Sequence, residues 1–437
     1  MSVKVLHTSD WHLGCMVRGE SRVQDHDAVI AEITAIAREF EPDLVLHTGD
    51  LFNGSRPGHE DLLRALRAVR NLSEIAPVLV LAGNHDAPSC FELLAEAVGA
   101  PPPQNDWDPY AICELPIRFL PKPCTATRGA VATYGSASGT PVRVGCLPFL
   151  HANRVVEGLE EITDFSATYT DKVNRITQAI SEVVFAPADY GSTVAVWASH
   201  LHVDGVRTSS ERQIHIDSNY ATDASHIHAG YSYLAFGHIH MPQEVPGGRG
   251  RYAGSPIEID FGEEGEAKGV VLVTAEPATR ARVEVRPLTS GRRIRRLRGT
   301  LEQLDQMAAE IGRDICVVTV DDAPDDVESL NRAARDALPD ACVVQVIDGR
   351  SPVAVSIDDL ADDGEPRSEE SLGTAYRRYL EEELSTRPQT DAEPQRIAEL
   401  FDELLASVEA IDEPDPREAA ELARLETAEL VPPNEVA

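Results

Sequence analysis

The sequence lacks any continuous apolar run of about 18 residues, the length that a helix needs to span a membrane. The N-terminus also lacks a basic segment followed by an apolar one, because the strand-like run Val3–Thr8 starts almost at once. We therefore expect no contact with a membrane, no signal peptide and a cytoplasmic location.

Closely spaced cysteine pairs are also missing. The seven cysteines are odd in number, widely scattered, and never separated by only two residues. This spacing argues against a CxxC metal or redox site and favours reduced thiols in a cytosolic protein. A hydrophobic content of 42% nevertheless provides for a sizeable core.

Lysine is scarce, since only four of the 39 basic residues are lysine. The net charge is −34, and residues 350–437 hold 24 acidic side chains against eight arginines. Against this acidic background, residues 280–298 hold eight arginines and one glutamate. This basic segment has two interpretations: it binds nucleic-acid phosphates through its charge, or it pairs with acidic groups of the same chain.

Short apolar runs alternate with amphipathic helical patterns along the first 100 residues, which predicts an α/β core with buried strands. Residues 100–128 are rich in proline and polar groups and are interpreted as an irregular excursion. The predicted strands of this part are Val3–Thr8, Asp43–His47, Val78–Leu81, Val142–Cys146, Thr193–Ser199, Ser232–Phe236, Gly269–Thr274 and Arg282–Arg286, and the predicted helices are Val23–Phe40, Glu60–Asn71, Phe91–Val98 and Tyr169–Phe185.

A compact βαβαβ pattern follows and predicts a small second domain. Its predicted elements are Arg292–Gly299, Leu301–Ile311, Ile315–Val320, Val327–Leu338 and Cys342–Ile347. We therefore divide the chain into a core domain at 1–288, a cap at 289–350, and an acidic linker with a helical tail at 351–437. Two amphipathic tail helices, Leu372–Leu384 and Pro394–Ile411, need a surface to cover, either on a partner or on their own chain.

Polar side chains of the kinds that bind metals follow five of the predicted strands. The motifs are Asp10-Trp11-His12, Gly49-Asp50, Gly83-Asn84-His85-Asp86, the single His200, and Gly237-His238-Ile239-His240. Loops at the ends of strands in an α/β core converge on one crevice, so these side chains are expected to meet there. A glycine before three of the motifs permits a sharp backbone turn into the crevice.

Carboxylate, imidazole and amide groups together suit Mn²⁺, Fe²⁺ or Zn²⁺ better than metals that prefer thiolates. Alternate residues of an extended segment face the same way, so both ends of Asp-x-His and of His-x-His can reach one site. One such motif alone carries little information. Five in this order, each after an apolar strand, predict a metal centre.

The order of these motifs is similar to that of the calcineurin-like metallophosphoesterases. More narrowly, the chain resembles the SbcD family of nuclease subunits, through Gly49–Phe52 with Ser55-Arg56-Pro57, and through Tyr252–Pro256 with Asp260–Glu263 and Lys268-Gly269. This resemblance implies a four-layer α/β/β/α sandwich with a small α/β cap and a helical C-terminal tail.

The resemblance also implies the role of each site residue. One metal ion is expected on Asp10, His12 and His240, a second on Asn84, His200 and His238, and Asp50 is expected to bridge the two. His85 resembles the catalytic histidine that contacts the phosphate and protonates the leaving group. Asp86 is placed to orient His85, and its alternative role is that of a turn-capping aspartate.

The activity of the SbcD family implies a function for the chain. It predicts a two-metal DNA exonuclease and endonuclease, with Mn²⁺ as the expected metal, that works on DNA ends and hairpins with an SbcC-type ATPase, as a homodimer within a heterotetramer. The alternative is a phosphodiesterase of the same superfamily that acts on small molecules. Two positions stay open: His202 is the alternative to His200, and Asn53 stands where relatives carry His or Asp, which leaves the exonuclease polarity undetermined.

Overall fold

The structure is a computed structural model that describes residues 2–101, 103, 105–151, 168–210 and 221–350. The described residues belong to one compact unit. The expected tail helices Leu372–Leu384 and Pro394–Ile411 lie outside the described residues. None of the described helices is long and apolar enough to cross a membrane.

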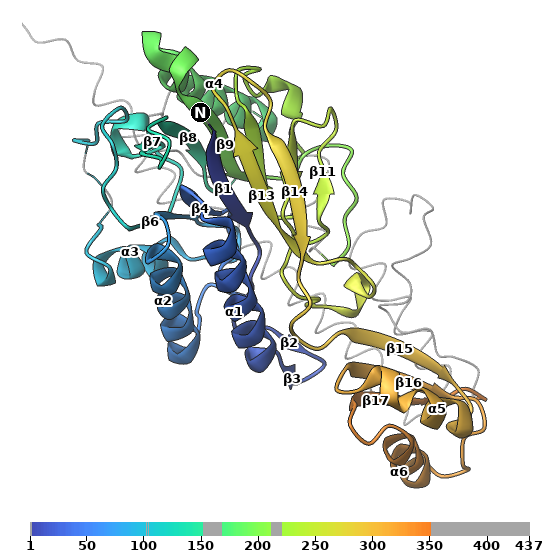
Figure 1. The fold of residues 1–437 in the computed structure, drawn as a ribbon. Helices are drawn as coiled ribbons and strands as arrows, with labels where there is room; N and C mark the ends of the chain where they lie inside the picture. Colours follow the sequence, from blue (N-terminus) through green and yellow to red (C-terminus); the bar gives the residue numbers. More distant parts are fainter. Residues whose placement is uncertain (1, 102, 104, 152–167, 211–220, 351–437) are drawn as a thin grey trace, which may run out of the picture. The chain divides into compact units, whose positions relative to one another are not determined.

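The first sheet has six strands in the order β14-β13-β1-β4-β5-β6 (Figure 1). Strands β1, β4, β5 and β6 run parallel to one another, whereas β13 is antiparallel to β1 and β14 is antiparallel to β13. Their bounds are β1 Val3–Thr8, β4 Leu44–His47, β5 Val78–Leu81, β6 Ile117–Leu120, β13 Gly269–Ala275 and β14 Arg282–Pro287.

The second sheet has six strands in the order β11-β12-β10-β9-β8-β7. Strands β8, β9, β10 and β12 run parallel, and β7 and β11 close the edges in antiparallel fashion. Their bounds are β7 Val131–Tyr134, β8 Val142–Leu147, β9 Val194–His200, β10 Tyr233–Gly237, β11 Gln243–Glu244 and β12 Gly250–Tyr252.

Side chains alternate strictly between two hydrophobic clusters along the first sheet. In β4, Leu44 and Leu46 belong to the cluster shared with the second sheet, and Val45 belongs to the cluster beneath the helices. Strand β5 repeats this alternation. A strand whose two faces are both buried needs apolar residues at every position, which is why periodicity alone showed no polar face.

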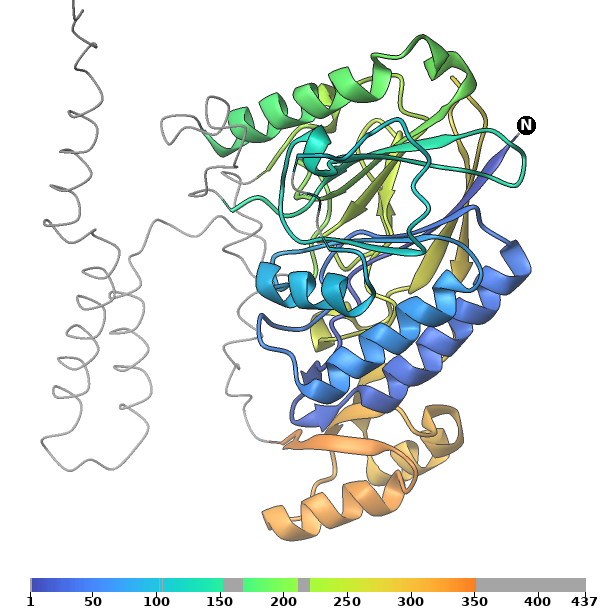
Figure 2. The same ribbon diagram turned by 90° about the vertical axis from the view of Figure 1, so that its left-hand side faces the viewer.

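Four layers result. Helices α1 (Val23–Phe40), α2 (His59–Ser73) and α3 (Pro88–Ala97) cover the outer face of the first sheet, and α4 (Tyr169–Phe185) covers the second. Figure 2 shows the green α4 and the blue α1 and α2 on opposite sides of the paired sheets. The predicted α/β/β/α sandwich is confirmed.

A separate three-stranded parallel sheet follows, with strands β15 (Ile294–Gly299), β16 (Ile315–Val320) and β17 (Cys342–Asp348). Helices α5 (Leu301–Ile311) and α6 (Val327–Ala337) pack on it around a hydrophobic cluster of their own. A capping box formed by Thr300 and Gln303 begins α5. The βαβαβ order is as expected, while the domain limits at 288 and 350 stay predictions.

The segment 100–128 is less irregular than expected, because it contains β6, an edge strand of the first sheet. Pro116 and Pro121 flank this run of four residues, and the buried Arg118 interrupts its apolar pattern, so composition hid the strand. Two further strands, β2 (Met16–Val17) and β3 (Glu20–Ser21), form a short hairpin directly after the first metal-type motif. Strands β2, β3 and β6 are too short to show a hydrophobic periodicity in the sequence.

All seven cysteines are free, and five of them are buried. Burial raises the pKa of the Cys15 and Cys146 thiols to about 12, so both stay protonated near neutral pH. They behave as small apolar core residues, in agreement with the expectation from their spacing.

Candidate metal centre

The loops that follow β1, β4, β5, β9 and β10 meet at one edge of the two sheets. They bring together two groups of buried side chains that share Asp50: Asp10, His12, Asp50 and His240 in one, and Asp50, His200 and His238 in the other. Parallel strands place their carboxyl ends at the same edge, so ligands from both sheets reach one crevice. Every residue expected in the metal centre lies here, while metal binding itself stays a prediction for each.

Asp50 stands between the two groups. Its Oδ2 atom lies 3.6 Å from His12 Nε2 and 3.5 Å from His200 Nε2. Its Oδ1 atom accepts a hydrogen bond of 2.9 Å from the backbone N–H of His85. One oxygen is thereby anchored to the backbone, and the other faces both groups, as a bridging carboxylate requires.

The first group has a buried polar atom that lacks a hydrogen-bond partner among the described residues. Asp10 accepts from the His238 backbone N–H at 3.0 Å through Oδ1, while its buried Oδ2 has no hydrogen-bond partner. The Nε2 atoms of His12 and His240 face each other at 3.0 Å. A buried carboxylate oxygen without a donor, beside two converging ring nitrogens, is a costly arrangement that a bound cation relieves.

The second group converges on the side-chain oxygen of Asn84. This Oδ1 atom lies 2.9 Å from His200 Nε2 and 2.9 Å from His238 Nδ1. The other ring nitrogen of His200 donates to the backbone carbonyl of Thr48 at 2.8 Å, which turns Nε2 toward the site. Asn84 thus lies with the second group, and its role as a metal ligand stays a prediction.

The backbone is strained at four of these positions. Asp10, His12, Asp50 and His238 have φ angles of 51°, 47°, 51° and 104°. Residues with a Cβ rarely adopt these left-handed conformations, and they persist only where the surrounding structure enforces them. Concentrated strain at the converging side chains indicates a functional site.

The glycines before the motifs are needed more for close packing than for turning. Gly49 does have a positive φ of 110°. At Gly83, however, a Cβ atom would lie 2.1 Å from Asp50 Oδ1, and at Gly237 one would lie 2.2 Å from the Thr48 carbonyl oxygen. The expectation of a sharp turn therefore holds at Gly49, whereas the other two glycines allow neighbouring loops to approach.

Charges in the centre are strongly coupled. Burial opposes ionisation of Asp50, but His200 outweighs it and holds the pKa of that carboxyl well below its usual range. Burial disfavours the charged form of His200, yet Asp50 raises its pKa to about 9. Burial and the neighbouring His240 ring lower the pKa of His12 well below 6.5. The negative charge of Asp50 therefore favours a positive charge beside it.

The residues fit two divalent ions. Oxygen and imidazole donors, one shared carboxylate and an acceptor without a partner are the donor set of a two-metal hydrolytic site. When bound, such ions supply Lewis-acid polarisation of the phosphate and a nucleophilic water. The protein supplies the fixed side chains and the cavity of about 160 Å³ that His12, Asp50, Asn84, His85 and His240 line together with Asn53, Ser210, His238, Ile259 and Asp260.

His85 lines this cavity and is half-buried. Its Nδ1 atom lies 2.9 Å from the backbone carbonyl oxygen of Asn53, and its ring is edge-on to that of His12. The carbonyl accepts the Nδ1 proton, which leaves Nε2 for chemistry in the cavity. The backbone of residue 53 orients His85, so the unusual Asn53 side chain does not affect this contact.

The predicted role of Asp86 as the partner of His85 is wrong. Its carboxylate accepts three backbone N–H groups, from Leu51 at 3.1 Å, Phe52 at 3.0 Å and Gly83 at 2.9 Å. Asp86 has no hydrogen bond to the His85 ring among the described residues. These N–H groups belong to the two site loops that follow β4 and β5, and the Asp86 carboxylate accepts all three. This matches its alternative role as a turn-capping aspartate.

His200 rather than His202 belongs to the described clusters. His202 is buried, and its ring lies 6.3 Å from that of His238. His200 is the last residue of β9, so the extended backbone turns its side chain toward Asp50, while His202 lies beyond the strand end.

Sequence reasoning missed the residues that support the centre from behind. His7, in β1, lies 2.9 Å from Thr48 Oγ1 and 3.0 Å from the Tyr233 hydroxyl, which joins the two sheets. Glu263 lies 2.9 Å from His240 Nδ1. The Asp260–Glu263 and Lys268-Gly269 passages were noticed only as part of a resemblance, because a partner 23 positions from its histidine leaves no local pattern.

The structure favours the second interpretation of the arginine-rich segment. Six of its eight arginines form ion pairs with carboxylates of the same chain: Arg286 with Glu39, Arg292 with Asp25 and Glu20, Arg293 with Glu258, Arg295 with Asp314, Arg296 with Glu264, and Arg298 with Asp321. These charges are largely neutralised within the chain. Arg292, Arg293 and Arg296 attach β15 to the core. Arg295 and Arg298 instead pair with residues that flank β16 of the same small sheet.

Comparison with known families agrees with this geometry. The model of the calcineurin-like phosphoesterase family matches residues 3–242, which contain every residue of the two groups. The chain belongs to this family. It is a metal-dependent phosphoesterase with a divalent dimetal site.

Two curated relatives are named as the SbcD component of the SbcCD nuclease. That of Bacillus subtilis is 29% identical over 296 residues, which cover 66% of this chain and 71% of the relative. That of Rhodobacter capsulatus is 28% identical over 287 residues, which cover 62% and 66%, respectively. Among solved structures, a dimetal phosphatase from Danio rerio is similar at a TM-score of 0.38, with 11% identity over 65% of this chain and 98% of that protein.

Proposed function

We propose that this chain is the nuclease subunit of an SbcCD-type complex, a Mn²⁺-dependent exonuclease and endonuclease that acts on DNA ends and hairpins in repair and recombination. The observation that carries the hydrolytic part is the single oxygen of Asp50 that faces both buried groups. The DNA substrate and the ATPase partner rest on the likeness to the SbcCD relatives.

The size of the cavity supports a polymeric substrate. Pockets that enclose a small ligand usually exceed about 300 Å³. The cavity at the metal centre measures about 160 Å³, so it admits a phosphodiester group while the attached sugars and bases stay outside. A backbone that passes over the site suits this shape better than an enclosed small molecule.

The residues of the site have separate roles in the proposed reaction. Asp10, His12, Asp50, Asn84, His200, His238 and His240 would hold the two ions. His85 would contact the phosphate and give its Nε2 proton to the leaving oxygen, while the Asn53 carbonyl holds its other nitrogen. Asp50 links the metal-binding residues to His85, because its Oδ1 atom accepts a hydrogen bond from the His85 backbone N–H.

The test is DNA cleavage by the purified chain across Mn²⁺, Mg²⁺ and Zn²⁺, with linear and hairpin DNA. We expect Mn²⁺-dependent cleavage of both. In His85→Ala, kcat should fall by about 10²–10⁴, because a general acid is lost, while the metal content stays at the wild-type value. Hydrolysis of a nitrophenyl phosphodiester without any DNA cleavage would instead establish the small-molecule alternative.

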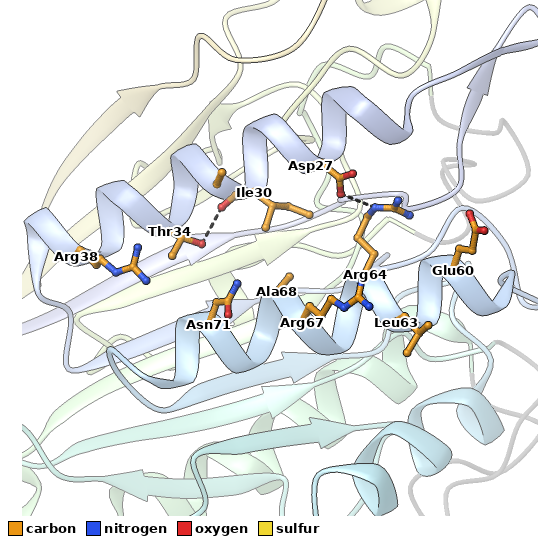
Figure 3. A pocket seen from close by; sticks show the side chains of 11 residues that line it. Asp27, Ile30, Thr34, Arg38, Glu60, Leu63, Arg64, Arg67, Ala68 and Asn71 are labelled. Carbon is orange, nitrogen blue, oxygen red and sulfur yellow. Dashed lines mark hydrogen bonds and ion pairs between the residues drawn. The ribbon is translucent and has the colours of Figure 1, made fainter.

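We also propose that the chain forms a homodimer through α1 and α2, and that it works in the cytoplasm with an SbcC-type ATPase. A hollow of about 580 Å³ lies between these helices. Figure 3 shows the acidic and basic side chains that line it. Leu63 is 50% exposed there, and Arg67 has no ion pair among the described residues. A second copy of the chain can bury Leu63 and pair Arg67 with Glu60. Light scattering should therefore show a dimer for the wild type and a monomer for Leu63→Asp.

A further inference from the structure

A buried ionic cluster lies behind His240, outside the cavity of the metal centre. Glu263 is fully buried, with Oε1 at 2.9 Å from His240 Nδ1. Its Oε2 accepts from Lys268 Nζ at 2.7 Å and from the Ser255 hydroxyl at 3.2 Å. Glu263 is absent from the cavity lining, so it cannot touch a substrate there.

The contact between Glu263 and His240 fixes which ring nitrogen carries the proton. A carboxylate at Nδ1 accepts the N–H, so Nε2 keeps its lone pair. That Nε2 atom points into the first group, where it lies 3.0 Å from His12 Nε2. The ring can therefore offer a lone pair to an ion beside Asp10 and His12 without rotating first.

Lys268 lies directly against the Glu263 carboxylate. Both side chains are buried, and the Lys268 ammonium donates to Glu263 Oε2 at 2.7 Å, which fixes the position of the carboxylate. The same ammonium donates to the His240 carbonyl oxygen at 3.1 Å and to Glu266 at 2.7 Å. One lysine thus fixes both the acceptor of the His240 ring and the backbone that carries the ring.

We propose that Glu263, held by Lys268, is a positioning residue for His240 that raises the affinity of the Asp10–His12–His240 group for its metal ion. His200 has a neutral support at the equivalent ring atom, the Thr48 carbonyl. The two groups of the centre are therefore supported differently, and loss of the Glu263 charge weakens one group selectively. This inference depends on the metal centre of the proposed function but not on its substrate.

The test compares Glu263→Gln with Glu264→Gln in the full chain. Glu264 is the next residue, carries the same charge, and pairs with Arg296 away from the centre. Mn²⁺ binding is measured by titration calorimetry and by electron paramagnetic resonance of free Mn²⁺. We expect Glu263→Gln to bind one of its two ions about 10–100-fold more weakly, with the other ion unchanged. Glu264→Gln should bind both ions as the wild type does.

Turnover separates positioning from catalysis. In Glu263→Gln, the Mn²⁺ concentration for half-maximal activity should rise by the same factor, while kcat at saturating Mn²⁺ stays within about twofold of the wild-type value. If Glu263→Gln fails to fold, the charge-neutral pair Glu263→Gln with Lys268→Met removes the buried charge imbalance and answers the same question.

Wild-type affinity for both ions in a folded Glu263 variant would overturn the inference, and so would equal weakening of both ions. Failure of the proposed function looks different. In that case the wild-type chain binds two ions but leaves DNA intact, and the comparison of Glu263→Gln with Glu264→Gln can still be completed.

Discussion

At the scale of single residues, histidines outside the metal centre also support it. His26, on α1, is buried and lies with Nε2 at 2.7 Å from the carbonyl oxygen of Trp11. Trp11 lies between Asp10 and His12, so this hydrogen bond fixes the loop that carries both. Burial lowers the pKa of His26 from 6.5 to about 4, and the folded chain therefore favours the neutral ring.

The His26 shift predicts a pH dependence of stability. Because its folded pKa is depressed, His26 contributes stability that is complete above pH 6.5 and is lost as the pH falls toward about 4. The contribution has an upper limit of about 3 kcal/mol. Urea unfolding of the chelator-treated chain between pH 4 and 7 should show a shallower pH slope in His26→Gln than in the wild type, since glutamine can still donate to Trp11. Equal slopes would contradict this assignment.

Asp86 provides a second prediction at this scale. Asp86→Ala leaves the N–H groups of Leu51, Phe52 and Gly83 without their acceptor. We expect the free energy of unfolding to fall by about 2–4 kcal/mol, because buried donors lose a charged partner.

Asp27→Ala is the matched control for Asp86→Ala, since Asp27 is 58% exposed and its ion pair with Arg64 lies at the surface. That control should lose less than about 1 kcal/mol. A comparable loss in the two variants would mean that Asp86 does not hold the site loops.

At the scale of elements, the strand ends must approach one another more closely than ordinary side chains allow. A Cβ at position 83 would lie 2.1 Å from Asp50 Oδ1 and 2.3 Å from the Asp50 backbone nitrogen. The loops after β4 and β5 are therefore in direct backbone contact. The metal centre exists because this contact places Asp50 and Asn84 side by side.

Gly83→Ala should separate these loops. We expect a loss of at least about 2 kcal/mol in the free energy of unfolding, because the clash involves backbone as well as side chain, together with weaker Mn²⁺ binding in titration calorimetry. Gly191→Ala is the control, since nothing lies within 4 Å of a Cβ at that position. Normal metal binding by Gly83→Ala would show that the loops tolerate the added methyl group.

Much of this architecture could be predicted from the sequence, because long elements carry a strong period. The bounds of β1 (Val3–Thr8), α1 (Val23–Phe40) and α4 (Tyr169–Phe185) agree with the predicted ones. Strand β6 (Ile117–Leu120) could not be found, since four residues between two prolines show no period and a buried arginine breaks their apolar run. Hydrophobic periodicity gives no usable signal over only four residues.

The residues of the site also fall into those that the sequence could predict and those that it could not. The seven residues expected to bind metal could be picked out because each stands at or just after the end of an apolar strand. Asp86 was adjacent to His85 in sequence, and adjacency suggested a contact that the turn does not make. The support of His240 by Glu263 and of His26 by Trp11 depends on tertiary packing alone. Contacts of this kind become visible only when the loops are placed in space.

At the scale of the whole molecule, carboxylates attach the small sheet to the core. Strand β15 (Ile294–Gly299) is an edge strand, so its outward N–H groups need acceptors. Glu258 accepts from the Ile294 N–H at 2.7 Å, and Glu264 accepts from the Arg296 N–H at 2.7 Å. Arg293, just before this strand, and Arg296, within it, add ion pairs to the same two carboxylates. The basic patch that suggested phosphate binding is thus largely used inside the chain.

The segment between Glu258 and Glu264 also carries Glu263, which faces His240. One short segment therefore contacts both the small sheet and the metal centre. Val17, from the hairpin after the first motif, packs against Ile294 and Ile315 of the small sheet in the same region. Two of the site loops are consequently in contact with the sheet, which makes its attachment relevant to the geometry of the site.

The attachment itself can be tested through Glu258, whose side chain is 1% exposed. Glu258→Ala leaves the N–H groups of Ile294 and Gly265 without their acceptor and removes the partner of Arg293. We expect a loss of about 2–4 kcal/mol in the free energy of unfolding. Hydrogen exchange should also speed up in β15 before it does in β1 or β4, because only the attachment is weakened.

Glu310→Ala is the control for Glu258→Ala, since Glu310 pairs with Arg295 at 3.2 Å and is 71% exposed. Its loss should cost less than about 1 kcal/mol and leave exchange in β15 unchanged. Uniform acceleration across β1, β4 and β15 in Glu258→Ala would mean that the small sheet and the core unfold as one cooperative unit. Selective acceleration in β15 requires instead that Glu258 joins two parts of the chain that open separately, and this is the outcome that its buried contacts predict.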